Sequence, residues 1–342
     1  MHDHPYQRTQ AICLAVIAAI GLAGALFWLK PVMIPFVLSI LLAYLLGPMV
    51  DYLRTKLRLP NGLAIVFALL VCSLLFYGLV LLIASSVGDL TENSAKYQAK
   101  LEQMIDDGSR YAQAKGFEVD AATVKARLEA MNWGQTASDI ANGVIGFLSN
   151  TFLILIFAIY LLQGHGSQAD PVPQSAMQQK IEARIKRYLS IKVALSAATG
   201  ILTALILWSL GVDAALLFGT LAFLLNFIPS VGSMIATVLP IPLVLFEPST
   251  SGTTVVLTLV LPACVHVLIG NVIEPKIMGN SLELHPITIL LSLVFWGMLW
   301  GVPGMLLAVP ISATLCVLLD SQDGTRPIAN LMAGRRATPV PE

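Results

Sequence analysis

Long apolar stretches separated by short polar segments dominate the chain. Most of these stretches approach or exceed the roughly 18–20 residues that a membrane-spanning helix needs. The pattern therefore predicts an all-α polytopic membrane protein with about eight to ten membrane helices. The clearest apolar runs cover residues 11–29, 32–50, 61–85, 140–162, 191–210 and 253–272.

Two further apolar regions, 213–247 and 286–320, are each long enough for two short helices. Proline and glycine interrupt both near the middle, so we predict two broken helical hairpins. Each hairpin is either a pair of thin spans, giving about ten crossings, or a re-entrant hairpin, giving about six crossings and two hairpins. The interrupting residues are Pro229 and Gly232 in the first region and Gly301, Pro303 and Gly304 in the second.

The apolar and polar segments divide the chain into six predicted parts. Segment 86–138 shows helical spacing of apolar residues but is too small for an independent domain. It is either a cap packed on the membrane helices or a gating lid. The parts are three N-terminal membrane helices (1–85), a small helical extracytoplasmic segment (86–138), a membrane helix (139–162), a cytoplasmic amphipathic linker (163–190), a transport core that contains both hairpins (191–320) and a cytoplasmic tail (321–342).

Composition and charge support this organisation. The 342 residues are 56% hydrophobic and only 12% charged, against about 25% charged in soluble domains. The net charge is zero, so we expect no nucleic-acid partner. Lysine and arginine gather in loop 51–60, in segment 163–190 and in the C-terminal tail. By the positive-inside rule these lie in the cytoplasm, with both termini, and residues 178–192 form an amphipathic helix at that surface.

Four motifs resemble the AI-2E family, also called autoinducer-2 exporter-like or PerM-like permeases. The resemblance covers nearly the whole membrane part, in matching order and spacing. It implies a transporter of the bacterial inner membrane that carries a small polar solute, such as the quorum-sensing signal autoinducer-2, coupled to H⁺ or Na⁺. The motifs are AYLLGPMVDYL (43–53), FGTLAFLLNFIPSVGSMIATVLP (218–240), NVIEPKIMGNSLELHP (271–286) and WGMLWGVPGMLLAVP (296–310).

Other function classes lack their sequence motifs. The chain contains no GxxxxGK[ST] phosphate loop and no HExxH or GxSxG motif. We therefore expect a secondary transporter and no enzyme, cofactor or metal. A Na⁺/H⁺ antiporter and a non-transporting membrane scaffold are the alternatives. The oligomeric state is left open, with a homo-oligomer among the possibilities.

The helix breaks supply candidate binding groups. Backbone N–H and C=O groups at a break are tolerated in a membrane only inside protein or beside a water-filled cavity. Asn226 can bind a solute or cap a helix end, and Ser230 begins the next helix. The predicted pathway residues are Asn226, Pro229, Ser230, Gly232, His266, Asn271 and Glu274, and the predicted hinge or turn residues are Pro240, Pro275, Gly279, Gly301, Pro303, Gly304 and Pro310.

His266, Gly270 and Glu274 follow i, i+4, i+8 spacing, which places them on one side of a helix. A protonatable stripe of this kind suits proton-coupled transport. The alternative is structural: Glu274 anchors the helix end at the cytoplasmic interface beside Lys276, and His266 bonds a backbone carbonyl. Tryptophans are expected at the membrane interfaces. These are Trp28, Trp208, Trp296 and Trp300.

Overall fold

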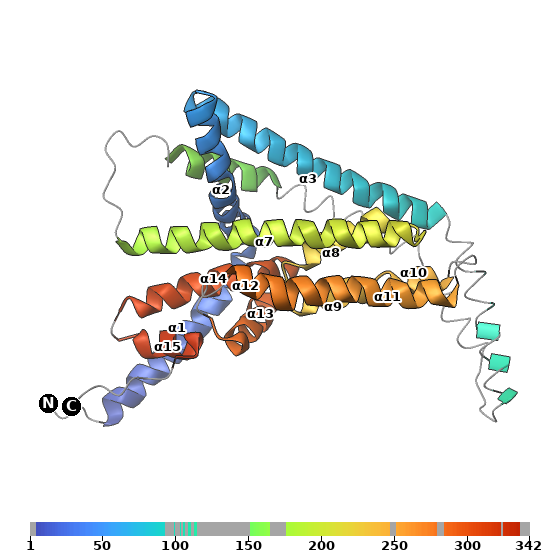
Figure 1. Cartoon of the computed structure of the whole chain (residues 1–342). Coiled ribbons are helices and arrows are strands. Elements are labelled where there is room, and N and C mark those ends of the chain that lie inside the picture. Colours follow the sequence, from blue (N-terminus) through green and yellow to red (C-terminus); the bar gives the residue numbers. More distant parts are fainter. Residues whose placement is uncertain are drawn as a thin grey trace. The chain divides into compact units, whose positions relative to one another are not determined.

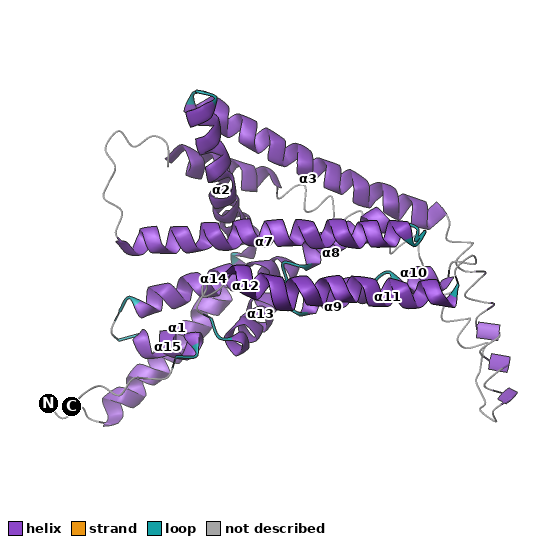
Figure 2. Ribbon diagram, in the orientation of Figure 1, coloured by secondary structure: helices purple, strands orange, loops and turns teal. Residues whose placement is uncertain are grey.

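A computed structural model shows a chain built of helices joined by short turns (Figure 2). It describes residues 5–92, 151–164, 176–246, 251–278, 284–322 and 324–335, together with isolated positions between 99 and 114. Every regular element in these residues is a helix, which confirms the all-α prediction. Most of segment 86–138, and Gly279 among the predicted hinges, lie outside the described residues.

The helices follow the predicted apolar runs closely (Figure 1). Five of them are long and apolar enough to cross a membrane: Lys30–Lys56, Asn61–Ser85, Glu182–Ser209, Gly252–Met278 and Val302–Asp320. A further apolar helix covers Thr151–Gly164. The labelled helices are α1 (Pro5–Trp28), α2 (Lys30–Lys56), α3 (Asn61–Glu92), α7 (Ala176–Ser209), α8 (Ala215–Leu225), α9 (Val231–Val238), α10 (Ile241–Phe246), α11 (Gly252–Val267), η1 (Leu268–Ile273), α12 (Glu274–Met278), α13 (Pro286–Trp300), α14 (Val302–Asp320) and α15 (Arg326–Ala333).

The chain forms two compact units. Unit 1 contains residues 1–68, 150–189 and 280–342, and unit 2 contains residues 69–149 and 190–279. Both units are therefore assembled from segments that are far apart in the sequence. The finer division into six parts stays a prediction.

The core of unit 1 is built around two tryptophans of α13. Trp296 and Trp300 are each 6% exposed, and their ring centroids lie 5.0 Å apart. The indole Nε1 of Trp296 donates to Ser312 Oγ at 3.3 Å, and that of Trp300 donates to the carbonyl oxygen of Leu26 at 3.1 Å. Both indoles are therefore packed inside unit 1, and their depth in the membrane stays a prediction. Trp28 and Trp208 are largely exposed.

The second hairpin, α13 and α14, turns on a single residue. Gly301 has φ 68° and ψ −144°, a region that is essentially restricted to glycine. One turn later, a Cβ at Gly304 would overlap the carbonyl group of Trp296. Glycine at both positions lets the two helices reverse direction and pack closely. Pro310 lies inside α14 and is buried.

Unit 2 contains the first hairpin, which consists of three short helices, α8, α9 and α10. Residues 226–230 separate α8 from α9, and a second break follows at Leu239 and Pro240. A Cβ at Gly232 would overlap the carbonyl group of Leu225, so this glycine holds α8 and α9 together. The predicted breaks are present in both hairpins. Whether the hairpins are re-entrant stays a prediction.

Helix α7 differs from the expectation of a separate surface helix over residues 178–192. These residues are the first turns of one continuous helix that ends at Ser209. No proline or glycine occurs before Gly200, so the sequence provides no point at which the helix would end. The basic start of α7 and the apolar stretch that follows thus share one axis.

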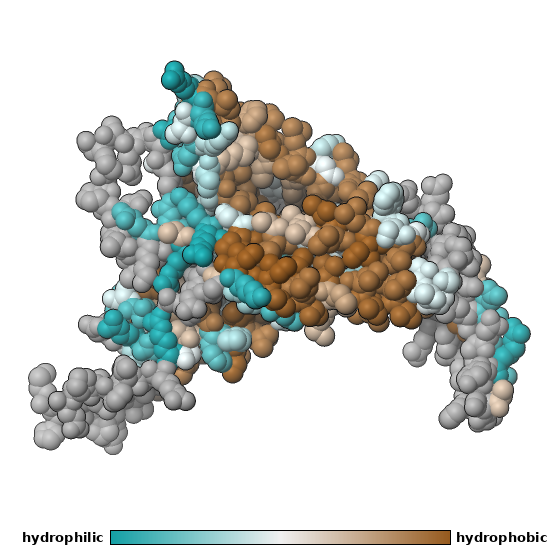
Figure 3. Space-filling model, in the orientation of Figure 1, coloured by the Kyte–Doolittle hydropathy of each residue, from teal (hydrophilic) through white to brown (hydrophobic). Residues whose placement is uncertain are grey.

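The visible surface of α11 in unit 2 is dominated by hydrophobic side chains (Figure 3). Val256, Val260 and Val267 are among the exposed apolar residues of this helix. An apolar surface of this extent is typical of lipid-facing helices. The protein is therefore a multi-pass membrane protein.

Candidate functional site: a polar cavity in unit 2

Unit 2 contains a polar cavity of about 540 Å³ among its apolar helices. Its walls come from α7, from the turn between α8 and α9, from α9 itself, and from the continuous helix α11–η1–α12. The polar or charged residues in the wall are Lys192, Asn226, Ser230, Ser233, Thr237, His266, Asn271 and Glu274. Such a set is unusual between membrane helices, where each buried polar group needs a partner or a role.

Close packing of α7 against α8 fixes one side of the cavity. A Cβ on Gly200 would lie 2.7 Å from the carbonyl oxygen of Gly219, so only glycine permits this approach. Two turns beyond Gly219, Asn226 follows the last turn of α8 and is 7% exposed. Its Nδ2 donates to Ser196 Oγ on α7 at 3.0 Å. Asn226 therefore both follows a helix end and crosslinks two helices beside the cavity.

The turn after α8 is strained at Ser230. This residue has φ 59° and ψ −54°, and the N–H of Val231 donates to the carbonyl oxygen of Pro229 at 2.6 Å. These features define a γ-turn of the rare positive-φ type. Backbone strain of this kind costs about 1–3 kcal/mol and is concentrated at functional sites. The Ser230 side chain makes no capping hydrogen bond to α9, and the residue lines the cavity.

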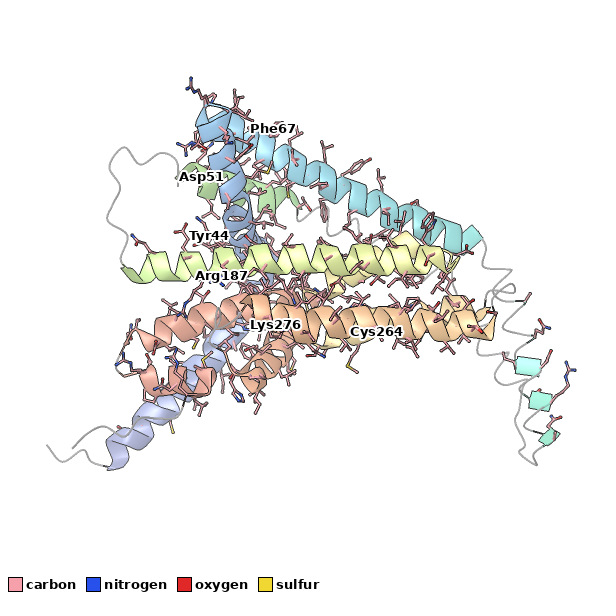
Figure 4. All side chains as sticks on the ribbon, viewed as in Figure 1. Tyr44, Asp51, Phe67, Arg187, Cys264 and Lys276 are labelled. Carbon is pink, nitrogen blue, oxygen red and sulfur yellow. The ribbon has the colours of Figure 1, made fainter. Side chains whose placement is uncertain are left out.

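The opposite wall is a long helix with a π-helical segment. Residues Leu268–Ile273 form η1, and the N–H of Glu274 donates to the carbonyl oxygen of Ile269, five residues earlier. Cys264 and Lys276, both labelled in Figure 4, mark the helix before and after this segment. A π-turn holds one more residue than an α-turn, so the spacing of side chains changes across it. His266, Gly270 and Glu274 nevertheless line the same cavity, as does Asn271.

Glu274 has a charged partner from another helix. Its Oε1 accepts a hydrogen bond from Lys192 Nζ at 2.7 Å, across 82 residues of sequence. The Lys192 side chain is 3% exposed and the Glu274 side chain 20% exposed. Glu274 thus has a partner inside unit 2, and whether it also anchors the helix end at the membrane interface stays a prediction. Lys276, two residues later, is exposed and does not line the cavity.

Lys192 begins a buried polar stripe on α7 that sequence reasoning missed. Ser196, Thr199 and Thr203 follow it at helical spacing, and all three are fully buried. The sequence signal was present: four polar residues at i, i+4, i+7 and i+11 share one helix face. The surface helix expected over residues 178–192 includes Lys192 among its basic residues, so the polar face that continues from Lys192 to Thr203 was not predicted.

His266 is the least satisfied polar group in the cavity wall. It is 6% exposed, and neither Nδ1 nor Nε2 has a hydrogen-bond partner in the described part of the chain. A neutral imidazole carries one donor and one acceptor, so two hydrogen bonds are left for a ligand or for solvent. The expectation that His266 bonds a backbone carbonyl is not met.

Six of the seven predicted pathway residues line this cavity: Asn226, Pro229, Ser230, His266, Asn271 and Glu274. Gly232 does not, because it packs against α8. Pro240 separates α9 from α10, and Pro275 follows the π-helical segment. The second hairpin belongs to unit 1 and contributes no residue to the cavity wall. Its part in a solute pathway, like the binding roles of the other residues, stays a prediction.

Comparison with known proteins places this arrangement in a family. The profile of the AI-2E family transporter matches residues 15–322. The chain belongs to the AI-2E transporter family. The family inferred from the four sequence motifs is therefore confirmed.

Named bacterial relatives cover nearly the full length of this AI-2E transporter. It is 28% identical over 310 residues to the "AI-2 transport protein TqsA" of Escherichia coli K12, covering 88% of this chain and 89% of the relative. It is also 28% identical over 337 residues to a "Putative transport protein" of Haemophilus influenzae, covering 94% of both chains. A third relative, "Putative transport protein YhhT" of Escherichia coli K12, is 24% identical over 347 residues and is covered to 98%.

Proposed function

We propose that the protein is a secondary transporter that exports a small polar solute, such as autoinducer-2, through the cavity of unit 2. The observation that carries the proposal is a polar cavity among apolar helices, with a buried histidine whose two ring nitrogens have no hydrogen-bond partner among the described residues. Its volume of about 540 Å³ is within the range of small-molecule sites, about 300–1,000 Å³. The relative named as an AI-2 transport protein supports this solute.

The cavity offers hydrogen bonds that match a hydroxylated solute. Within the part of the chain that the structure describes, the imidazole of His266 has a donor and an acceptor without partners, and Ser230 lines the same cavity. The side chains of Asn226 and Asn271 add amide groups. Because an unmade hydrogen bond in a buried site is costly, a solute that satisfies these groups gains binding energy.

Proton coupling is proposed at Glu274. Its carboxylate is the only acidic group among the described residues of the cavity wall, and it is partly exposed to the cavity. Protonation would weaken the ion pair with Lys192 and change the hydrogen bonds available to the solute. The protein is proposed to lie in the bacterial inner membrane with both termini in the cytoplasm, as the basic residues of loop 51–60 indicate.

Proteoliposomes that contain the full chain test the proposal. Uptake of autoinducer-2 is measured by mass spectrometry with and without an imposed pH gradient. We expect saturable uptake that depends on the gradient in wild type, and no gradient dependence in Glu274→Gln. Lys276→Gln is the matched control, because Lys276 is exposed and two residues away. Unchanged pH dependence in Glu274→Gln would refute the coupling role.

The same vesicles separate the alternatives. A Na⁺/H⁺ antiporter would move protons when a Na⁺ gradient is imposed, without any effect of autoinducer-2. A scaffold would show no saturable flux, and its cellular function would survive Asn226→Leu combined with Glu274→Gln. Either result would replace the proposed solute transport.

A further inference from the structure

We propose that Lys192 is the resident counter-cation of Glu274, and that it excludes Na⁺ from the carboxylate so that the coupling ion at this site is the proton. The inference rests on the proposed function in one respect, that an ion is coupled to transport. The ion selectivity of the cavity depends only on contacts within unit 2.

The charges of the cavity are already balanced. Lys192 Nζ lies 2.7 Å from Glu274 Oε1, at the distance of a charge-assisted hydrogen bond. The titratable groups in the described cavity wall are Lys192, His266 and Glu274, and Lys276 next to Glu274 on α12 points outside that wall. With a neutral imidazole, the cavity therefore has no net charge. A buried pair of this kind is stable only while both partners are present.

A sodium ion cannot join this pair at low cost. Na⁺ bound to the carboxylate would lie close to the ammonium group, and Lys192 is too deeply buried to move its charge into solvent. The repulsion between two unit charges about 4 Å apart weakens binding by roughly a thousandfold at the effective dielectric constant of a protein. The ammonium group thus occupies the position that Na⁺ would need.

A proton also gives up the attraction of the ammonium group, but it needs no coordination shell. Bound covalently to one oxygen of Glu274, it leaves the other oxygen to accept a hydrogen bond from Lys192. Na⁺ needs several oxygen ligands around the carboxylate, where the ammonium group already lies. The contact therefore leaves room for a proton at Glu274 and none for Na⁺.

Removing the ammonium group should convert the cavity into a sodium site. In Lys192→Met the apolar stem is kept, and Glu274 is left without a cation. We expect Na⁺ to take this place and to stabilise the folded protein, since a ligand that binds only the folded state raises the unfolding midpoint. Wild type should not respond to Na⁺.

The test is thermal unfolding of the purified full chain in 150 mM NaCl and in 150 mM choline chloride, without solute. We expect equal midpoints for wild type and a midpoint about 3 °C higher in Na⁺ for Lys192→Met. Lys192→Met combined with Glu274→Gln should lose this difference. Lys186→Met is the matched control, because Lys186 pairs with Glu182 on the same helix but is exposed to 35%.

Two outcomes overturn the inference: a Na⁺-specific rise in wild type, or no rise in a folded Lys192→Met. Should Lys192→Met not fold in either salt, Lys192→Gln keeps a hydrogen bond to the carboxylate and is judged by the same criterion. Because no solute is present, absence of autoinducer-2 uptake would contradict the proposed function and leave this result intact.

Discussion

Replacing His266 by leucine should stabilise the protein and strongly reduce transport. The imidazole is 6% exposed, and neither nitrogen has a partner among the residues with a described position. Each unsatisfied buried polar group costs about 1–3 kcal/mol. Hydration on the cavity side recovers part of this cost, so we expect a net gain of ~1 kcal/mol in the free energy of unfolding. Leucine is close to histidine in volume and leaves no large void.

The gain is small but measurable in purified full-length protein. For a chain of this length, 1 kcal/mol corresponds to a rise of about 1–2 °C in the unfolding midpoint. Transport of autoinducer-2 in proteoliposomes should fall by about tenfold or more, which corresponds to the loss of one hydrogen bond of ~1.4 kcal/mol to the solute. A rise in the free energy of unfolding together with a fall in transport is expected when a functional group is costly to bury.

Thr258 supplies the matched control. It lies on the same helix, it is fully buried, and its Oγ1 also lacks a partner in the described residues, but it does not line the cavity. Thr258→Val should therefore stabilise the protein by a similar amount and leave transport within about twofold of wild type. A His266→Leu variant that is less stable than wild type, or that transports normally, would refute the reasoning.

Three further variants probe the turns and the core. Gly301→Ala should destabilise the protein by about 1–3 kcal/mol in thermal unfolding, because φ 68° with ψ −144° suits only glycine. The control Gly324→Ala, at a position with open space around it, should have little effect. Trp300→Phe should cost ~1 kcal/mol through loss of the hydrogen bond to Leu26, with a matching shift in the midpoint. Ser230→Val should destabilise by about 1–2 kcal/mol, since a β-branched side chain opposes positive φ, and Ser230→Gly should not.

Local chemistry made the breaks of both hairpins predictable. Proline lacks the N–H that continues a helix, and glycine accepts the backbone angles and the close contacts of a tight reversal. These properties act within a few residues. Pro229 and Gly232 therefore predict the break in the first hairpin, and Gly301 and Gly304 predict the break in the second. The same holds for the apolar runs, whose first residues lie within two positions of the starts of α2, α3 and α11.

The charge partner of Glu274 could not be predicted in the same way. Lys192 is 82 residues away, and although its polar face on α7 is visible in the spacing, the helix that this face meets depends on tertiary packing. The π-helical segment Leu268–Ile273 likewise has no residue pattern of its own, because it arises from one extra residue accommodated in a helix. The packing of Trp296 and Trp300 inside unit 1 depends in the same way on distant acceptors, Ser312 Oγ and the carbonyl oxygen of Leu26.

The hydrogen bond from Trp300 to Leu26 links residues that are made at very different times. At roughly 5–20 residues per second, a ribosome needs about 12–50 s to proceed from the end of α2 to α13. Unit 1 also requires residues up to the C-terminal region, whereas every segment of unit 2 has been synthesised by residue 279. During that interval α1 and α2 lie in the membrane without the neighbours that α13 and α14 later provide. The first helices to be inserted are thus among the last to be packed, and lipid or an insertion factor has to cover them until then.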